Sequence, residues 1–330
     1  MRARTLAVAS CALVFVHCGG QAGPNPTPTP TATPVPAATP VPEPLIAAAG
    51  DIACGADRAG LPCRHLETSD LIIRIGEEHG RLAAVLPLGD LQYNFGFLEE
   101  FNRFYDPSWG RFKTLSRPVL GNHEYEAGPP SGYFDYWNGR NAQNGVAGQR
   151  DLGYYSFNLG SWHLVALNSN CREVPGGGCQ AGSAQERWLK TDLDQNARPC
   201  TLAYWHHPRF TSGQSQRLAP SPALLEPLWQ TLYDQGADVI LVAHDHFYER
   251  FAPQTPGGQA DARRGIRQFT VGTGGRDLYP FESIARNSEM RYNVGFGVLF
   301  MELRPRSYAW KFVGVDAVAG HPDEGEAECH

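Results

Sequence analysis

Five short apolar segments of the sequence each end in side chains that bind metal ions well. These side chains are two carboxylates, a carboxamide and several imidazoles, which together offer oxygen and nitrogen donors. A mixed set of this kind suits zinc, iron or manganese better than calcium, which prefers oxygen ligands alone. The segments and the residues that follow them are 45–50 before Asp51, 83–89 before Asp90, 118–121 before Asn122 and His123, 201–205 before His206 and His207, and 239–243 before His244 and His246.

Taken singly, each of these residues has an ordinary structural interpretation. An Asp or Asn after Gly most often forms a turn, and a lone His among apolar residues is most often a hydrogen-bonded core residue. The case for a site is the joint occurrence of all five junctions. One carboxylate shared between two ions about 3.5–4 Å apart gives an arrangement used for displacement at phosphorus, with a metal-bound hydroxide as nucleophile. With that hydroxide as nucleophile no Ser or Cys nucleophile is required, and the sequence contains neither a G-x-S-x-G elbow nor a Gly-rich phosphate loop ending in Lys.

The segments between the junctions predict helices. Helical patterns begin near Glu67, at Ser183 with its capping-box partner Glu186, and at Ser221, and the last of them ends at Gly236. Strands that alternate with helices predict an α/β domain, in which binding sites gather at the carboxyl ends of the strands. We therefore expect the five junctions to converge.

In order along the chain, the junctions resemble the motifs of the calcineurin-like metallophosphoesterases, most closely the purple acid phosphatase branch. The matching motifs are Gly50-Asp51, Gly89-Asp90-Leu91-Gln92-Tyr93, Gly121-Asn122-His123-Glu124, His206-His207-Pro208 and His244-Asp245-His246. The resemblance covers about residues 45–315. It implies a four-layer α/β/β/α sandwich of two mixed sheets flanked by helices, a binuclear metal centre and hydrolysis of phosphate esters.

The ligand positions of the family, carried over to this sequence, define two metal sites. The resemblance implies that Asp51, Asp90, Tyr93 and His246 hold the first metal, and that Asp90, Asn122, His206 and His244 hold the second. His206 rather than His207 is the implied ligand because it stands two places before Pro208. His123 is the implied catalytic residue, which donates a proton to the leaving group or stabilises its charge. Glu124, His207 and Asp245 are expected to orient ligands or to face the substrate.

Two departures from the family pattern bear on this assignment. Ala53 stands where many members of the superfamily place a His, and Tyr93 replaces that ligand, as in the purple branch. Because a phenolate is a hard donor, the resemblance implies Fe(III) paired with Zn, Mn or Fe(II). The alternative for Tyr93 is a buried aromatic residue with a hydrogen-bonded hydroxyl. The second departure is Ala243, where the last motif usually has Gly.

The flanking segments also fit this family. Residues 154–157 and 162–169 predict two strands of a sheet, in which His163 is a core histidine rather than a ligand. Residues 269–275 and the alternating segment 300–312 resemble the second sheet of the family.

The N-terminal segment has the pattern of an export signal. A basic start precedes an apolar run at 5–16 that is too short to span a bilayer, and Cys18 or Cys11 could be a lipid-attachment cysteine. Residues 24–44 contain nine prolines and five threonines, which predicts an extended spacer. The expected organisation is a signal peptide at 1–18, a linker at 19–44, a catalytic domain at 45–315 and a C-terminal tail at 316–330.

The net charge and the cysteines indicate which partners and which cellular compartment to expect. The 330 residues carry 28 Lys and Arg against 34 Asp and Glu, a net charge of −6, so no nucleic-acid partner is expected and membrane attachment is expected only through an N-terminal lipid. Beyond the signal the cysteines are Cys54, Cys63, Cys171, Cys179, Cys200 and Cys329. In an oxidising compartment, the two short loops 54–63 and 171–179 are the candidates for local disulfides.

These patterns predict an exported binuclear metallohydrolase, periplasmic, on the cell surface or secreted, that cleaves small phosphomonoesters. A phosphodiesterase of the same superfamily is the alternative, because the same motifs serve both reactions. A non-catalytic surface protein braced by metals is a further alternative, although it would not need His123. Arg209 and Arg217 are candidate phosphate contacts, or else solvated surface residues. Three loops are expected to shape the cleft, namely 128–150, 172–182 and 209–219.

Overall fold

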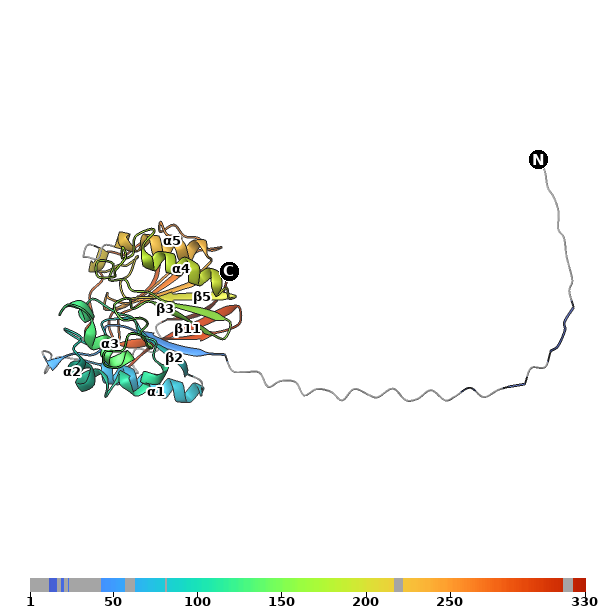
Figure 1. Cartoon of the computed structure of the whole chain (residues 1–330), viewed down its shortest axis with the longest axis horizontal. Helices are drawn as coiled ribbons and strands as arrows, with labels where there is room; N and C mark the ends of the chain where they lie inside the picture. The colour runs from blue at the N-terminus through green and yellow to red at the C-terminus, as the bar shows by residue number, and fades with distance from the viewer. Residues whose placement is uncertain are drawn as a thin grey trace, which may run out of the picture. The chain divides into compact units, whose positions relative to one another are not determined.

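Two β-sheets lie face to face with helices on their outer sides in the computed structural model of the chain (Figure 1). The structure describes residues 12–16, 19–20, 23, 43–56, 63–80, 82–216, 222–316 and 323–330. Residues 42–330 form one compact unit. The order of layers, helix, sheet, sheet and helix, confirms the predicted α/β/β/α sandwich.

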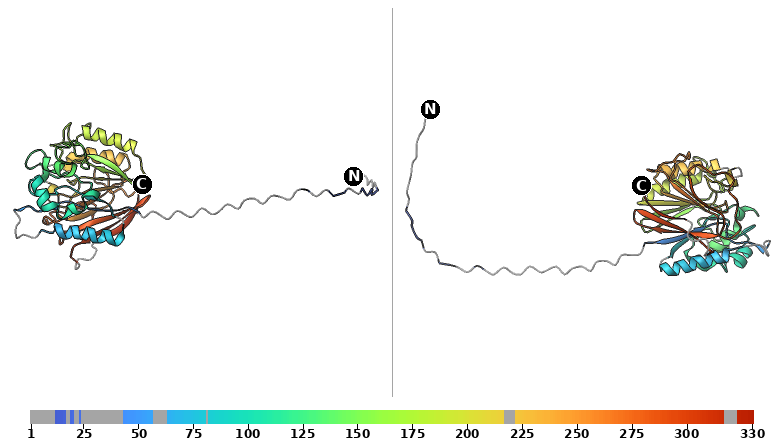
Figure 2. Two further views of the ribbon diagram at one scale, coloured as in Figure 1. Left: turned by 60° about the horizontal axis from the view of Figure 1, so that its bottom comes forward. Right: turned by 180° about the vertical axis from the view of Figure 1, so that it is seen from behind.

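The first sheet has five strands in the order β12-β11-β10-β1-β2. Only β1 and β2 are parallel; the other neighbours are antiparallel. Its strands are β1 (Leu45–Ala49), β2 (Leu82–Pro87), β10 (Gly297–Leu303), β11 (Ser307–Gly314) and β12 (Asp323–Glu328). Helix α1 (His65–His79) lies along the outer face (Figure 2) and buries Leu71, Ile72 and Ile75, the side chains that give its sequence a helical period.

The second sheet has seven strands in the order β3-β4-β5-β6-β8-β7-β9, with β4, β5, β6 and β8 parallel. Its strands are β3 (Tyr155–Leu159), β4 (Trp162–Ala166), β5 (Cys200–Tyr204), β6 (Val239–Val242), β7 (Tyr248–Phe251), β8 (Arg267–Val271) and β9 (Ser288–Tyr292). Helices α4 (Ala184–Gln195) and α5 (Glu226–Asp234) cover its outer face (Figure 1). As predicted, Ser183 caps α4, because its side chain accepts a hydrogen bond from the Glu186 amide.

Shorter helical segments complete the connections. They are α2 (Leu98–Glu100), η2 (Phe101–Tyr105), η3 (Trp109–Leu115), η4 (His123–Tyr125), α3 (Ser131–Asn138), η5 (Gln214–Gln216) and η6 (Pro222–Leu225).

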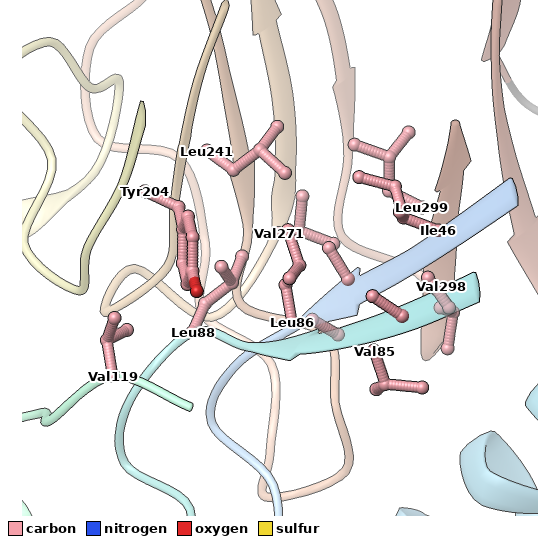
Figure 3. Packing of buried hydrophobic residues seen from close by; sticks show 14 of the residues in the cluster. Ile46, Val85, Leu86, Leu88, Val119, Tyr204, Leu241, Val271, Val298 and Leu299 are labelled. Atoms are coloured by element: carbon pink, nitrogen blue, oxygen red, sulfur yellow. The ribbon is translucent and has the colours of Figure 1, made fainter. Parts of the chain in front are cut away.

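The main core lies between the two sheets. Figure 3 shows Leu86 of the first sheet beside Val271 of the second, and both side chains are fully buried. A second cluster, which includes Trp229, packs the seven-stranded sheet against α4 and α5. Because the central strands are covered on both faces, they appear in the sequence as continuous apolar runs, which made the strand ends easy to predict.

Two predictions about the sheets are wrong. Residues 269–275 do not join 300–312 in one sheet, because 267–271 form β8, which pairs with β6 and β7 in the other sheet. Residues 316–330 are not simply a tail, because β12 pairs with β11 along the edge of the first sheet. The strand Asp-Glu-Gly-Glu-Ala-Glu is strongly acidic, a composition that suits an exposed edge strand and gives little apolar signal in the sequence.

Three disulfides lie within the described residues. Cys54–Cys63 and Cys171–Cys179 close the two predicted loops, and Cys200–Cys329 joins the start of β5 to the end of the chain. Most of the predicted signal peptide and linker, with Cys11 and Cys18, lies outside the described residues. No helix in the described part of the chain is both long and apolar enough to cross a bilayer.

Candidate metal centre

Three of the predicted ligands lie where the backbone turns sharply after a strand. Asp51, Asp90 and His244 have φ angles of 59°, 49° and 69°, in the left-handed region that residues other than glycine seldom adopt. Such conformations cost about 1–3 kcal/mol each and cluster at functional sites. The turns after β1, β2 and β6 therefore bring these side chains to the edge where the carboxyl ends of both sheets meet.

Two glycines let these turns approach one another. A Cβ atom on Gly121 would lie 2.1 Å from Oδ1 of Asp90, so the glycine before Asn122 leaves space for that carboxylate. A Cβ atom on Gly50 would lie 2.5 Å from the Cβ of Ala243. The departure from the family pattern at position 243 therefore fits here only because position 50 carries no side chain.

The four residues assigned to the first metal form one cluster. The Tyr93 hydroxyl lies 2.8 Å from Oδ1 of Asp51, 3.1 Å from Oδ2 of Asp90 and 3.0 Å from Nε2 of His246. Nε2 of His246 lies 3.2 Å from Oδ1 of Asp51. All four side chains are buried, and their donor atoms face one another.

Asp90 also belongs to a second cluster. Its Oδ2 atom lies 3.2 Å from Nε2 of His206, which in turn lies 3.2 Å from Nδ1 of His244. Nδ1 of His206 lies 2.8 Å from the carbonyl oxygen of Leu88, which fixes the ring with Nε2 toward Asp90. The carboxylate of Asp90 thus lies between the two clusters, which is the position of a bridging ligand.

Two buried atoms at this edge lack a hydrogen-bond partner among the described residues. They are Oδ1 of Asn122 and Nε2 of His207. Buried polar atoms are nearly always hydrogen bonded, so atoms without a partner beside carboxylates suggest a place for cations. Ligand atoms of Asp51, Asp90 and His206 lie within 4.8 Å of one another, as do those of His206, His207 and His244. The donors therefore fit the expected metal ions in both number and type.

The charges at the site are strongly interdependent. Burial alone would lower the pKa values of both histidines that face carboxylates, but Asp90 raises the pKa of His206 to about 9 and Asp51 raises that of His246 to about 10. Burial and the neighbouring His206 lower the pKa of His244 to about 3. In the metal-free site, protons on His206 and His246 thus balance the carboxylates, and metal ions would replace those protons.

His123 lies at the more open side of the centre, with its side chain 26% exposed. Its Nδ1 atom lies 2.9 Å from the carbonyl oxygen of Asn94, and its Nε2 atom lies 3.9 Å from Oδ2 of Asp90. Its ring centroid is 4.2 Å from that of Tyr93. The histidine is therefore held by one nitrogen and presents the other to the metal-binding side chains.

Glu124 and Asp245 support the site through neighbours other than the ligand side chains that we expected. Glu124 accepts hydrogen bonds from the backbone amides of Asp90 and Gly121, at 3.0 and 2.7 Å, and so joins the second and third junctions. Asp245 accepts a hydrogen bond from the Thr211 hydroxyl at 2.5 Å, and so holds the segment that follows His206 and His207. Both carboxylates are buried and fix backbone segments.

Two supporting residues were missed by the sequence analysis. Oδ1 of Asp277 lies 2.7 Å from Nδ1 of His246, an arrangement that orients ligating histidines in metal sites. The guanidinium of Arg276 lies 4.5 Å from the ring centroid of Tyr93, and its Nη2 atom donates a hydrogen bond to Oδ1 of Asn94. Their position directly after the glycine-rich turn that follows β8 is the one signal that could have revealed them.

The remaining candidates lie elsewhere. Arg209 forms an ion pair with Glu226 at 2.9 Å and donates two hydrogen bonds to the carbonyl oxygen of Pro256, so it is a structural residue rather than a phosphate contact. Arg217 lies outside the described residues. His163 is buried in β4, between Asn158 and Asp192, as predicted for a core histidine.

Comparison with known proteins identifies the family of the chain. The family model for calcineurin-like phosphoesterases matches residues 45–248. Purple acid phosphatase 15 of Arabidopsis thaliana is 28% identical over 221 residues, which are 62% of this chain and 40% of the relative. Acid phosphatase type 7 of Homo sapiens is 28% identical over 227 residues, which are 64% of this chain and 48% of the relative. The chain thus spans less than half the length of either relative.

Solved structures show the same fold. Purple acid phosphatase PPD1 from seeds of yellow lupin (Lupinus luteus) superposes with a TM-score of 0.67 at 18% identity, covering 88% of this chain and 55% of that one. Together with the matched motifs, these similarities identify the family. The chain belongs to the calcineurin-like phosphoesterases, and the relatives compared above are purple acid phosphatases and an acid phosphatase.

Proposed function

We propose that this protein is an exported, binuclear metal-dependent phosphatase that hydrolyses phosphomonoesters. The observation that carries the proposal is the position of Asp90, whose carboxylate contacts both clusters of donors. The proposed ligands are Asp51, Asp90, Tyr93 and His246 for one metal and Asp90, Asn122, His206 and His244 for the other. Bound metal ions would supply positive charge to the phosphate and would activate a water molecule.

His123 is the proposed catalytic acid. With Nδ1 donating to the carbonyl oxygen of Asn94, a protonated imidazole carries its second proton on Nε2, the nitrogen on the metal-binding side. As the bond between phosphorus and the leaving oxygen breaks, His123 can transfer this proton to the oxygen.

Tyr93 is the proposed ligand of a ferric ion. The Tyr93 hydroxyl lies within 3.1 Å of three other candidate ligands, which supports a phenolate bound to Fe(III). The purified protein should then show a visible charge-transfer band that Tyr93→Phe abolishes. A colourless wild-type protein that contains two metal equivalents would show that the pair lacks a ferric phenolate.

Three disulfides support export. Such bonds persist in oxidising compartments and are rare in the cytosol, and they tie down loops in both halves of the described domain. The predicted signal and proline-rich linker agree with this location. Detection of the protein in a periplasmic, surface or culture fraction tests the proposal, and retention of the disulfide-free protein in the cytosol would contradict it.

The enzymatic proposal is tested with two synthetic substrates. Protein purified without added ions should contain two metal equivalents and should hydrolyse p-nitrophenyl phosphate with a higher kcat/KM than bis-p-nitrophenyl phosphate. A reversed order would favour the diesterase alternative. His123→Ala should keep both metals and lose about 10²–10⁴-fold in kcat, the usual contribution of a general acid. Full activity in that variant would remove the assigned role of His123.

A further inference from the structure

A cavity of about 290 Å³ opens beside the candidate metal centre, with Asn122 in its wall. One wall comes from the segment that begins at Asn122 and continues through Tyr125 and Glu126. The opposite wall comes from the segment that follows β4 and includes Asn170, Arg172 and Glu173. The loop 172–182, which the sequence predicts to shape the cleft, thus supplies part of the wall through its first two residues.

Hydrogen bonds and a disulfide fix the walls of this cavity. The Tyr125 hydroxyl accepts a hydrogen bond from Nδ2 of Asn168 at 2.9 Å. Nδ2 of Asn170 donates to Oδ1 of Asn168 at 2.9 Å, and the backbone carbonyl of Asn170 accepts from the amides of Glu173 and Val174. The disulfide Cys171–Cys179 closes the loop that carries Arg172. The cavity is therefore formed before a ligand binds, which lowers the entropic cost of binding.

Three charged side chains around this cavity are exposed and form no ion pair with another described residue. They are Glu126, Arg172 and Glu173. The charges have both signs, with carboxylates on both walls and the guanidinium on one. A ligand with an ammonium group and a carboxylate group would find a partner for each. The polar walls and the single aromatic residue, Tyr125, offer little for a nucleobase, which is usually held by stacking.

We propose that this cavity is the leaving-group subsite and that it binds the zwitterionic part of an O-phosphorylated amino acid such as O-phosphoserine. The inference rests on the proposed phosphomonoesterase function. Asn122 places the phosphate at the boundary between the metal centre and the subsite. The ammonium group lies toward Glu126 and Glu173, and the carboxylate lies toward Arg172. Hydrolysis transfers the phosphoryl group from the serine oxygen to water, and a proton passes to the serine oxygen as the P–O bond breaks.

Four substrates with the same phosphate but different charges test this assignment in the metal-loaded enzyme. O-phosphoserine has both groups, O-phosphoethanolamine has only the ammonium, 3-phosphoglycerate has only the carboxylate, and glycerol 1-phosphate has neither. Because the charged side chains are exposed, each matched charge should raise kcat/KM by only about two- to fivefold, chiefly through KM. O-phosphoserine should therefore lead, glycerol 1-phosphate should be last, and the other two should lie between them.

Substitutions test which side chains recognise the carboxylate of the substrate and which recognise its ammonium group. Arg172→Gln should remove the advantage of 3-phosphoglycerate over glycerol 1-phosphate and leave that of O-phosphoethanolamine. The double variant Glu126→Gln and Glu173→Gln should remove the advantage of O-phosphoethanolamine over glycerol 1-phosphate and leave that of 3-phosphoglycerate. Arg263→Gln, which changes an exposed arginine between β7 and β8, is the matched control and should keep the wild-type order.

The outcomes distinguish this inference from the proposed function. Equal kcat/KM for the four substrates, with p-nitrophenyl phosphate hydrolysed normally, would overturn the subsite and leave the phosphatase in place. A preference that survives in both sets of variants would also overturn it. No hydrolysis of any monoester by metal-loaded protein would overturn the proposed function itself.

Discussion

His163 and His206 are both buried histidines that face a carboxylate, but their surroundings differ. Nε2 of His163 lies 2.7 Å from Asp192, and its Nδ1 lies 2.8 Å from Oδ1 of Asn158, so each ring nitrogen has one neutral or anionic partner. Nε2 of His206 lies 3.2 Å from Asp90 and equally close to a nitrogen of His244. His163 completes a hydrogen-bond network within β3, β4 and α4. His206 instead belongs to a cluster of possible metal-ligand atoms that lie close to one another.

The difference shows how a structural polar cluster can be distinguished from a metal-binding one. Around His163, Asp192 also accepts from Ser156 at 2.7 Å, and the cluster has backbone of ordinary conformation. At the strand ends, Oδ1 of Asn122 and Nε2 of His207 have no hydrogen-bond partner in the part of the chain that the structure describes, and left-handed backbone occurs at Asp90. A polar cluster in which every buried polar atom is hydrogen bonded stabilises the fold. A cluster with buried polar atoms that have no partner is more suited to binding a ligand or an ion.

Replacing Asp90, the proposed bridging ligand, should give the largest effect. Asp90→Asn removes a charge shared by both clusters, so kcat/KM should fall by about 10³-fold or more and at least one metal should be lost. Metal analysis and steady-state kinetics measure both changes. Asp192→Asn is the matched control on the structural side and should keep both metals. An Asp90→Asn protein that retains two metals and its activity would contradict the assignment of this residue.

Replacing the structural histidine should change stability instead. His163→Ala leaves Asp192 and Asn158 without their buried partner, which should lower the free energy of unfolding by about 2–3 kcal/mol. Urea denaturation measures this loss, and metal content and kcat should stay at wild-type values. If His163→Ala loses metal without losing stability, the distinction between the two clusters fails.

Removing Arg276 should have an intermediate effect. Arg276→Gln loses the cation above the Tyr93 ring and weakens the contact with Asn94, whose carbonyl orients His123. We expect about a tenfold loss in kcat, with a smaller change in KM and a shift of any visible band that arises from Tyr93. Arg276→Lys should restore part of the activity. A change in KM alone would place this residue in substrate binding rather than in positioning.

The pH dependence of the metal-free protein should give the smallest effect. The pKa values of His206 and His246 in the folded protein, about 9 and 10, lie above the ordinary value near 6.5. Between pH 6.5 and these raised pKa values, the folded protein therefore binds more protons than the unfolded protein. This contribution to stability is complete below about pH 6.5 and is lost as the pH rises toward 9 and 10. Thermal unfolding in chelator at pH 7, 8 and 9 should show a falling Tm, and a rising Tm would contradict it.

Much of this cluster could be predicted because its proposed ligands follow strands that are almost entirely apolar. Asp51, Asp90, His206 and His244 each follow two or three positions after the end of such a strand, and parallel strands bring their carboxyl ends to one edge. The resemblance then divided the ligands between two metals. The fold class followed from the same alternation of strands and helices.

The parts that could not be predicted depend on contacts between distant segments. Asp277 reaches His246 and Arg276 reaches Tyr93 from a turn whose sequence gives no spacing pattern. Strand β12 has little apolar character, so its pairing with β11 is visible only in three dimensions. The cavity beside Asn122 likewise arises from two segments nearly fifty residues apart.

The two ends of the folded unit have a practical consequence for attachment. Pro44 precedes β1, and Cys329 is bonded to the first residue of β5, so both ends lie where these strands begin (Figure 2). Asp51 and His206 follow the opposite ends of the same strands, roughly 15–20 Å away at the usual rise per residue. Immobilising the folded unit through either of its ends should therefore leave the edge that carries the proposed ligands turned toward the solution, which makes fusions at these ends suitable formats for assays.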